Sequence, residues 1–218
     1  MVTQQPSGIV AFLFTDVENS TAMWDQLGGD MASRLEAHDQ IMRRIIESHG
    51  GYVFSTAGDS FAAAFSSATN ALEAGFQIQL ALDTSEDVDQ IRVRMGIHSG
   101  EASIRDGDYF GPSVNRAARI MSLGHGGQIL VSATASSLIG DSLTEVQLTE
   151  LGTHSLAGFE SPERIFQADP ASGPVEFPPL RSTSAVANNL PEQPTPFIGR
   201  DVELAEIGQL MESSRVVT

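Results

Sequence analysis

The sequence predicts an α+β fold in which helices pack on an antiparallel-rich central sheet. Short apolar runs and longer segments with helical spacing of apolar residues follow one another as strand, helix, strand, strand, helix, strand. A glycine turn joins two of the strands directly, which favours antiparallel pairing. The length of 218 residues allows one good core and a tail.

The first half of the chain is expected to contain helices, a strand and a hairpin. In order, we expect a strand over residues 9–15, a helix beginning near residue 22, a helix over residues 32–49, strands over residues 52–55 and 61–65, and a helix over residues 68–82. Asn19, Ser20 and Thr21 precede the first helix and offer it side-chain caps. Gly50 and Gly51 end the second helix.

The second half is expected to supply the remaining strands and one further helix. In order, we expect a strand over residues 91–98, its hairpin partner over residues 101–105, a helix over residues 111–123, and strands over residues 128–131, 143–147 and 164–167. The first of these strands alternates Ile91, Val93, Met95 and Ile97 with polar residues or glycine, so it is half buried. The elements together predict a sandwich of helices on one sheet.

Two aspartates stand where they can face one crevice. Asp16 closes the first apolar strand, and Asp59 lies on the glycine turn of the hairpin. Two carboxylates this close repel each other unless a cation lies between them, and their oxygens suit Mg²⁺ or Mn²⁺, the metals that accompany triphosphates. In the alternative interpretation, Asp16 caps the following helix and Asp59 is an ordinary turn residue.

A third segment, residues 108–120, distinguishes these interpretations. It contains Val-Asn-Arg-Ala-Ala-Arg at residues 114–119. With Phe-Thr-Asp-Val at residues 14–17 and Gly-Asp at residues 58–59, this motif makes the chain similar to the class III adenylate/guanylate cyclases over about residues 9–167. The three motifs occur in the order of that family, and we therefore expect the sandwich to be of the ferredoxin-like, palm type.

The resemblance implies a role for each motif. Asp16 and Asp59 would hold two divalent cations, Mg²⁺ or Mn²⁺, and the backbone carbonyl of Val17 would join the second ion. Asn115 would orient the ribose of ATP. Arg119, four residues later on the same helical face, would stabilise the charge that builds on the α-phosphate.

The resemblance also implies an assembly, and the start of the first helix offers a loop for phosphate. Family members build each site at the interface of a head-to-tail dimer, so we expect a homodimer with two equivalent sites. Free amides at Asn19, Ser20 and Thr21, at a helix start, could cradle phosphate oxygens of the substrate. Plain helix capping is the alternative for this loop.

Base recognition is where the sequence departs from the family. The usual Lys four residues before the hairpin aspartate is Ser55, although the usual Asp before the Asn helix is present as Asp108. Losing a charged hydrogen bond of about 1.5 to 3 kcal/mol weakens recognition on the order of tenfold to a hundredfold. Ala157 stands where many relatives carry Lys or Arg for the triphosphate. We therefore expect weak conversion of ATP to cyclic AMP, better with Mn²⁺, and a preference for adenine through Asp108.

Composition excludes several other classes of protein. The formal net charge of -16 argues against binding of nucleic acid or anionic membranes. There is no cysteine, no run of about 18 apolar residues and no signal-peptide pattern. These features predict a cytoplasmic protein.

The chain is expected to have three parts. Residues 1–169 form the cyclase-like catalytic domain, and residues 170–196 form a linker that contains seven of the ten prolines. Residues 197–218 resemble the start of an AAA-related signalling ATPase, but the chain contains no Gly-x-x-x-x-Gly-Lys-Ser/Thr motif. We expect a truncated chain or a remnant of a larger regulator.

Three functions stay open at this point. The first is a homodimeric adenylate cyclase, favoured by Asp16, Asp59, Asn115 and Arg119. The second is a degenerate cyclase-like module that binds nucleotide or only dimerises and regulates an attached ATPase, favoured by the missing cations. The third, a palm-type polymerase or dinucleotide cyclase, explains the aspartates but not the Asn-Arg helix. His98 ends a strand and is expected to be structural rather than a catalytic base.

Overall fold

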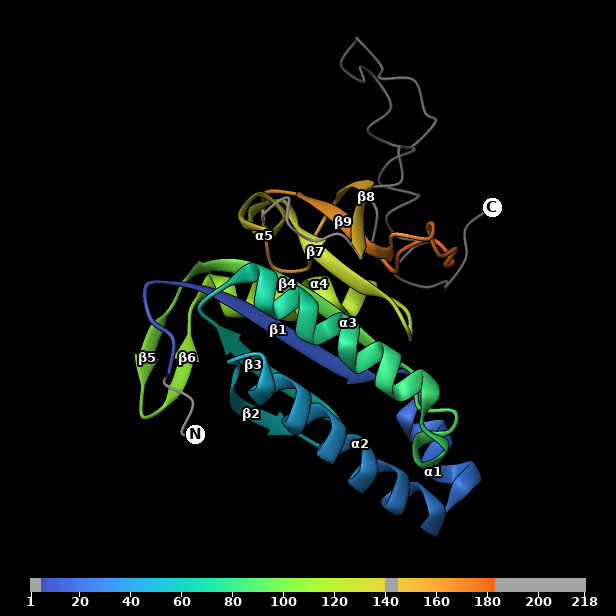
Figure 1. Ribbon diagram of the computed structural model, residues 1–218. Coiled ribbons are helices and arrows are strands. Elements are labelled where there is room, and N and C mark those ends of the chain that lie inside the picture. The colour runs from blue at the N-terminus through green and yellow to red at the C-terminus, as the bar shows by residue number, and fades with distance from the viewer. Residues whose placement is uncertain (1–4, 140–144, 183–218) are drawn as a thin grey trace, which may run out of the picture. The chain divides into compact units, whose positions relative to one another are not determined.

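The computed structural model describes residues 5–139 and 145–182 of the chain (Figure 1). Its strands are β1 Ile9–Val17, β2 Tyr52–Ala57, β3 Ser60–Phe65, β4 Val93–Glu101, β5 Ser103–Arg105, β6 Asp108–Phe110, β7 Ile129–Ser132, β8 Val146–His154 and β9 Glu163–Pro170. Its helices are α1 Ser20–Leu27, α2 Gly29–Ser48, α3 Ala68–Thr84, α4 Pro112–Leu123, α5 Ala133–Leu138 and the short 3-10 helix η1 Glu86–Val88. None of the described helices is both long and apolar enough to cross a membrane.

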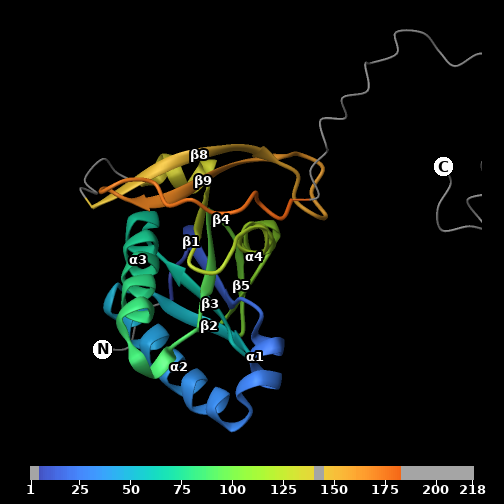
Figure 2. The same cartoon turned by 90° about the vertical axis from the view of Figure 1, so that its right-hand side faces the viewer.

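One seven-stranded sheet forms the centre of the fold. Its strand order is β2-β3-β1-β4-β7-β9-β8. Only the β4–β7 pair is parallel, and the other neighbours in this sheet are antiparallel. Helices α2 and α3 lie on one side of strands β1 to β4, and α4 lies on the other (Figure 2). The prediction of an α+β fold with an antiparallel-rich sheet is therefore confirmed.

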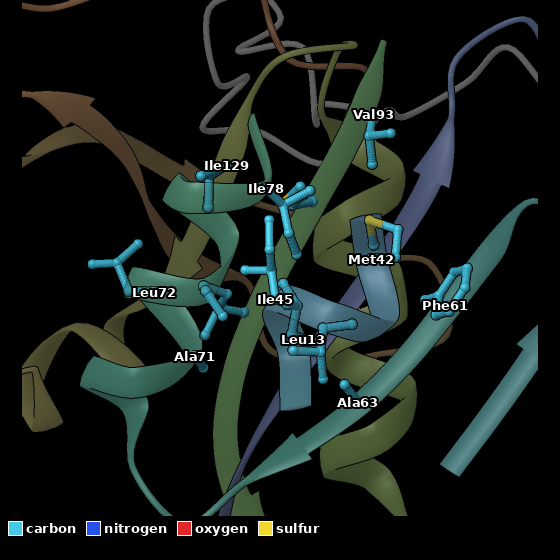
Figure 3. Packing of buried hydrophobic residues seen from close by; sticks show 14 of the residues in the cluster. Leu13, Met42, Ile45, Phe61, Ala63, Ala71, Leu72, Ile78, Val93 and Ile129 are labelled. Carbon is cyan, nitrogen blue, oxygen red and sulfur yellow. The ribbon is translucent and has the colours of Figure 1, made fainter. Parts of the chain in front are cut away.

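The larger core lies between the sheet and helices α2 and α3 (Figure 3). Alternate residues of β1, Ala11, Leu13 and Val17, belong to this core, because side chains of a strand point in turn to opposite faces. Leu13 packs there with Phe61 of β3 and with apolar residues of both helices. The even-numbered β1 residues, Val10, Phe12, Phe14 and Asp16, face the side of the sheet that carries α4.

Helix α4 packs closely on β4 at Gly96. A Cβ atom on Gly96 would lie 2.7 Å from Met121 Cα and 2.8 Å from Ala117 O, so only glycine allows this approach. Val10 and Phe12 of β1 form part of a second core on this side of the sheet. The close approach brings α4 over the same face of the sheet as Asp16.

Two local predictions are wrong. Helix α1 begins at Ser20 rather than near residue 22, and Asn19, in the left-handed conformation with φ 57°, makes no side-chain cap bond. Asparagine tolerates this conformation better than most residues, so the backbone turn itself starts the helix. Residues 101–105 were expected to pair with β4, but β5 pairs with β6 in a separate two-stranded sheet. Strand β4 is central, and both of its edges are already taken by β1 and β7.

The chain after β9 continues along the domain. The linker was expected to begin at residue 170, yet Arg181 N–H donates to Leu123 O at 2.9 Å and Gln167 Nε2 donates to Val175 O at 2.8 Å. Residues 171–182 therefore pack against the sheet and α4. The rest of the expected linker and the ATPase-like segment 197–218 lie outside the described residues, so those two assignments stay predictions.

Candidate active site

Strand pairing brings the segments that carry Asp16 and Asp59 to the same end of the sheet. Thr15 of β1 stands opposite Phe61 of β3, and the Phe61 backbone N–H donates to Thr15 Oγ1 at 3.3 Å. Next to this pair, Ser60 Oγ donates to Asp16 Oδ1 at 2.6 Å. Asp59 precedes Ser60 in the tight turn between β2 and β3. The two aspartates thus lie where β1 leaves the sheet and β3 enters it.

The guanidinium of Arg94 lies beside Asp16. The two residues stand opposite each other in the β1–β4 ladder. Nε and a terminal nitrogen of Arg94 donate to Asp16 Oδ2 at 3.0 and 2.5 Å. Arg94 was not among the predicted site residues, although the alternation of residues 91–98 put it on the polar side of its strand. The pair neutralises part of the carboxylate charge and places a guanidinium, a group able to bind phosphate, next to Asp16.

The Asp59 carboxylate has an oxygen free for a ligand. Its Oδ2 is buried and accepts no hydrogen bond from the described residues. A buried carboxylate oxygen without a donor is unfavourable unless a cation or solvent compensates it. A carboxylate oxygen without a donor is the kind of ligand that a hard cation such as Mg²⁺ or Mn²⁺ takes, whereas both oxygens of Asp16 are already bonded to Ser60 and Arg94.

The protein supplies few metal ligands of its own. Within residues 5–139 and 145–182, no group of three or more His, Cys, Asp or Glu side chains could hold a metal ion. Magnesium usually keeps several waters and takes one or two carboxylates together with phosphates of the substrate. A pair of carboxylates thus leaves most coordination positions of such an ion to water and to phosphate oxygens.

Asn115 and Arg119 project from the outer side of α4. Both are exposed, whereas Ala117 and Ile120 of the same helix are buried. They line a pocket of about 590 Å³. Its lining consists of Pro112, Asn115, Ala118, Arg119, Ala157, Gly158 and Phe159. All of these residues belong to α4 or to the loop between β8 and β9, and the pocket contains neither Asp16 nor Asp59.

Arg116 holds α4 against the β8–β9 loop. It forms an ion pair with Glu163 at the start of β9, and its guanidinium lies 4.4 Å from the centre of the Phe159 ring. The sequence pattern predicted no role for Arg116. Its contacts fix one wall of the pocket that contains Arg119.

His98 is a structural residue of this layer, as expected. Its side chain is 6% exposed, and its Nδ1 lies 2.8 Å from Ser132 Oγ. Burial, and secondarily the positive charge of Arg116, lowers the pKa of His98 to about 4. The imidazole is therefore neutral at pH 7 and held by a buried hydroxyl.

The two residues expected to recognise the base come from neighbouring strands. Ser55 is exposed on β2, next to Phe54, and Asp108 lies on β6, next to Tyr109. The rings of Phe54 and Tyr109 pack edge to face with their centres 5.0 Å apart. One Asp108 oxygen already accepts the backbone N–H of Tyr109 at 2.7 Å. Ser55 lies at an irregularity in the β2–β3 pairing, where the register shifts.

The loop of Asn19, Ser20 and Thr21 forms the start of α1. The first bond into the helix runs from Met23 N–H to Asn19 O at 3.1 Å. The earlier amides of a helix have no partner within it, and Asn19 does not cap them with its side chain. They are available to an anion. Phosphate binding by this loop stays a prediction.

Comparison with known proteins identifies the family. Residues 2–167 match the family described as the adenylate and guanylate cyclase catalytic domain. An uncharacterised protein of Mycobacterium tuberculosis is 37% identical over 204 residues, which cover 92% of this chain and 70% of that protein. An adenylate cyclase of Podospora anserina is 30% identical over 231 residues, covering 78% of this chain but 11% of that protein. The chain therefore spans only a small part of the Podospora cyclase.

Solved structures agree with this match. Adenylate cyclase from Trypanosoma brucei, studied in its monomeric state, superimposes with a TM-score of 0.76 at 26% identity and covers 83% of this chain and 95% of that one. An adenylate/guanylate cyclase/hydrolase from Silicibacter pomeroyi gives a TM-score of 0.66 at 29% identity, covering 73% and 95%. The chain belongs to the family of adenylate and guanylate cyclase catalytic domains.

Proposed function

We propose that this protein is an adenylate cyclase that converts ATP into cyclic AMP and pyrophosphate. The observation that carries the proposal is the presence of two separate half-sites, one acidic and one with an exposed amide and guanidinium. One half-site contains Asp16 and the unpaired Oδ2 of Asp59, and the other presents Asn115 and Arg119 in an exposed pocket. Acidic ligands and a separate guanidinium are the groups that a phosphoryl transfer from a triphosphate needs.

Asp16, Asp59 and the backbone carbonyl of Val17 would hold two divalent cations, Mg²⁺ or Mn²⁺. When bound, these ions lower the pKa of the attacking hydroxyl and neutralise charge on the phosphates. Ser60 keeps one Asp16 oxygen oriented through its 2.6 Å hydrogen bond. Arg94, already in contact with the other Asp16 oxygen, is positioned to move its guanidinium onto a phosphate oxygen.

The reaction is an intramolecular phosphoryl transfer. The ribose 3′ oxygen forms a bond to the α-phosphorus, the bond from that phosphorus to the bridging oxygen breaks, and pyrophosphate leaves. Little covalent help is required, so positioning and charge neutralisation supply most of the rate. Asn115 would orient the ribose, and the Arg119 fork would stabilise the charge on the α-phosphate.

A homodimer would complete each site. Asn115 and Arg119 are exposed rather than directed into their own chain's core, which supports their use by a second subunit. A two-fold assembly of this kind would contain two equivalent sites, and an isolated monomer would be inactive.

ATP is favoured over GTP as the substrate. Asp108 retains an oxygen that can accept from the exocyclic amine of adenine. Relatives named adenylate cyclase, among them one from Schizosaccharomyces pombe that is 33% identical over 172 residues, support the same choice. Activity is expected to be weak, because Ser55 and Ala157 replace cationic contacts. A cytoplasmic location stays a prediction.

An assay of the purified full chain with Mn²⁺ and ATP tests the proposal. Cyclic AMP and pyrophosphate should form in equal amounts, and the Asp59→Ala variant should form neither. Glu150→Ala is a matched control, since it removes an exposed carboxylate that pairs with Arg164 and lies on β8, the strand at the opposite edge of the sheet from the β2–β3 turn. Product formed equally by wild type and Asp59→Ala would refute the assigned metal ligands.

The second candidate is a cyclase-like module without turnover. The Asp16–Arg94 ion pair and the absence of cations at Ser55 and Ala157 are the features that favour it. It predicts nucleotide binding or dimerisation, measured by calorimetry and sedimentation, with no cyclic AMP at any metal concentration.

A further inference from the structure

We propose that residues 171–182, here called the strap, are part of the active-site scaffold, and that Arg181 positions the metal-binding end of β1 by clamping Glu18. The strap is the dark-orange chain that follows β9 in Figure 1. This inference rests on the proposed function only in assigning metal binding to Asp16 and Val17.

The beginning of the strap is anchored by a buried polar network. Asp169 at the end of β9 is 0% exposed, and its Oδ1 accepts the backbone N–H of Val175 at 3.0 Å. Gln167 Nε2 donates both to Asp169 Oδ1 at 2.6 Å and to Val175 O at 2.8 Å. Thr149 Oγ1 donates to the other Asp169 oxygen at 2.6 Å. The N–H of Val175 in the strap therefore ties the strap to the sheet. If the strap moved away, the buried Asp169 carboxylate would lose this hydrogen-bond donor, which is energetically unfavourable.

The far end of the strap reaches the end of α4. Leu180 packs against the buried cluster that includes Leu123 and Leu130. Arg181 N–H donates to Leu123 O, the last residue of α4, at 2.9 Å. The ring of His125 contacts Pro179 O through Nε2 at 3.0 Å. Packing and backbone bonds therefore fix where the Arg181 side chain begins.

From this position the Arg181 guanidinium forms an ion pair with Glu18. The two side chains are 41% and 21% exposed, so the pair is only partly screened by water. Glu18 is further enclosed: a Cβ atom on Gly126 would lie 2.8 Å from Glu18 Oε2. His125 Nδ1 lies 3.9 Å from the other Glu18 oxygen. The carboxylate is thus held from the strap and from the loop after α4.

Glu18 is the point at which β1 leaves the sheet. Val17, opposite Val93, is the last residue of the β1–β4 ladder. Beyond it the backbone is held by one further bond, from Glu18 N–H to Arg92 O at 2.8 Å, and then turns at the left-handed Asn19. The contacts of the Glu18 side chain with Arg181 and His125, which lie outside the sheet, therefore restrain the position of the Asp16–Val17 segment. Residues that orient a metal ligand in this way commonly change metal affinity or activity by about 10- to 100-fold when removed.

Arg181→Gln in the full chain tests the clamp. Backbone amides of residues 17–22 should exchange hydrogen for deuterium faster than in the wild type, with the core strands unchanged. The Mn²⁺ concentration that gives half-maximal cyclisation should rise about tenfold, the low end for a residue that orients a metal ligand. Arg181→Lys, which keeps the charge but not the fork, should restore part of both properties.

Arg164→Gln is the matched control. It removes an exposed arginine–glutamate pair of the same type, with Glu150 on β8, and should leave amide exchange in residues 17–22 and the Mn²⁺ dependence unchanged. Unchanged exchange and unchanged Mn²⁺ dependence in folded Arg181→Gln would overturn the proposal. Should Arg181→Gln not fold, the comparison of Arg181→Lys with wild type decides by the same two measurements. If the wild type forms no cyclic nucleotide, the proposed function is wrong. The clamp between Arg181 and Glu18 is then still tested by comparing amide exchange, and Mn²⁺ binding measured by calorimetry, in wild type and Arg181→Gln.

Discussion

Ser55 stands where the resemblance to the cyclases predicts a lysine that recognises the base. It is exposed on β2 and its hydroxyl lacks the reach and charge of lysine. Ser55→Lys should lower the KM for ATP about tenfold, because a charged hydrogen bond to the purine is worth about 1.5 to 3 kcal/mol. Steady-state kinetics with Mn²⁺ and ATP measures the change.

Thr56→Lys is the control for this substitution. Thr56 is the next residue of the same strand, also exposed, and its side chain points to the opposite face. The Thr56→Lys substitution therefore adds the same charge as Ser55→Lys, but the new side chain does not reach the base. An equal fall in KM for both variants, or none for Ser55→Lys, would show that Ser55 does not limit base recognition.

His98 makes the stability of the fold depend on pH. Its pKa is about 4 in the folded protein, mainly through burial, against an ordinary value near 6.5. Between these values the unfolded chain binds a proton that the folded chain does not, so the free energy of unfolding falls as pH falls through this window. The contribution lost between pH 7 and 4.5 is on the order of 2 kcal/mol.

His98→Gln should remove this contribution. Urea unfolding of wild type and variant from pH 7 to 4.5 should therefore give a shallower decline for His98→Gln, which keeps a polar group for Ser132 but does not titrate. Buried His38, whose pKa is also lowered by burial, remains in both proteins and does not affect the comparison. Parallel curves would mean that His98 is not the titrating group.

At the scale of elements, the contact between α4 and β4 sets the position of Asn115 and Arg119. Gly96→Ala would insert a Cβ atom against backbone atoms of α4, which cannot move aside as a flexible side chain could. Overpacking of this kind lowers the free energy of unfolding by about 1 to 3 kcal/mol. Gly29→Ala at the start of α2 is the control, because no atom lies within 4 Å of its added Cβ. Urea unfolding should show a loss for Gly96→Ala and none for Gly29→Ala, and equal stabilities would contradict the close approach.

Some helices and strands could be predicted from the local sequence pattern, and others could not. The amphipathic α2 follows from residue spacing, since it buries one side against a single partner layer. The strand at β4 was expected to be half buried, and that expectation is wrong: α3 and α4 cover its two faces, and residues 95–99 are buried. The pairing of β5 with β6 does not follow, because a short strand near β4 in sequence pairs with β4 only when an edge of β4 is free. Helix α5 was not predicted either. It is only six residues long, and so short a helix depends on tertiary packing more than on its own sequence.

At the scale of the whole molecule, the separation into two half-sites predicts complementation between inactive variants. Asp59→Ala removes the proposed metal ligand, and Arg119→Ala, which removes the proposed phosphate donor, should lose about 10²- to 10³-fold of the rate. Mixed in equal amounts and allowed to exchange subunits, they should form heterodimers in which one of the two sites is complete. About a quarter of the wild-type activity should return, because half of the dimers are mixed and each has one working site.

The same mixture tests the assembly. Exchange of subunits is verified by differently tagged chains that copurify. Copurification without recovered activity would mean that each site is built within one chain, and the two half-sites on α4 and at Asp16 would then need another explanation.

What the sequence determined by itself was the chemistry and the local periodicity. The Phe-Thr-Asp-Val, Gly-Asp and Val-Asn-Arg-Ala-Ala-Arg motifs and the alternation of β4 are local patterns, because side-chain type and spacing are written along the chain. Only the tertiary structure decided that Arg94 contacts Asp16, that Arg116 braces the α4 pocket and that residues 171–182 fold back as a strap ending on Glu18. Each of these contacts joins residues that are far apart in sequence, and no local pattern contains the strand order or packing that brings them together.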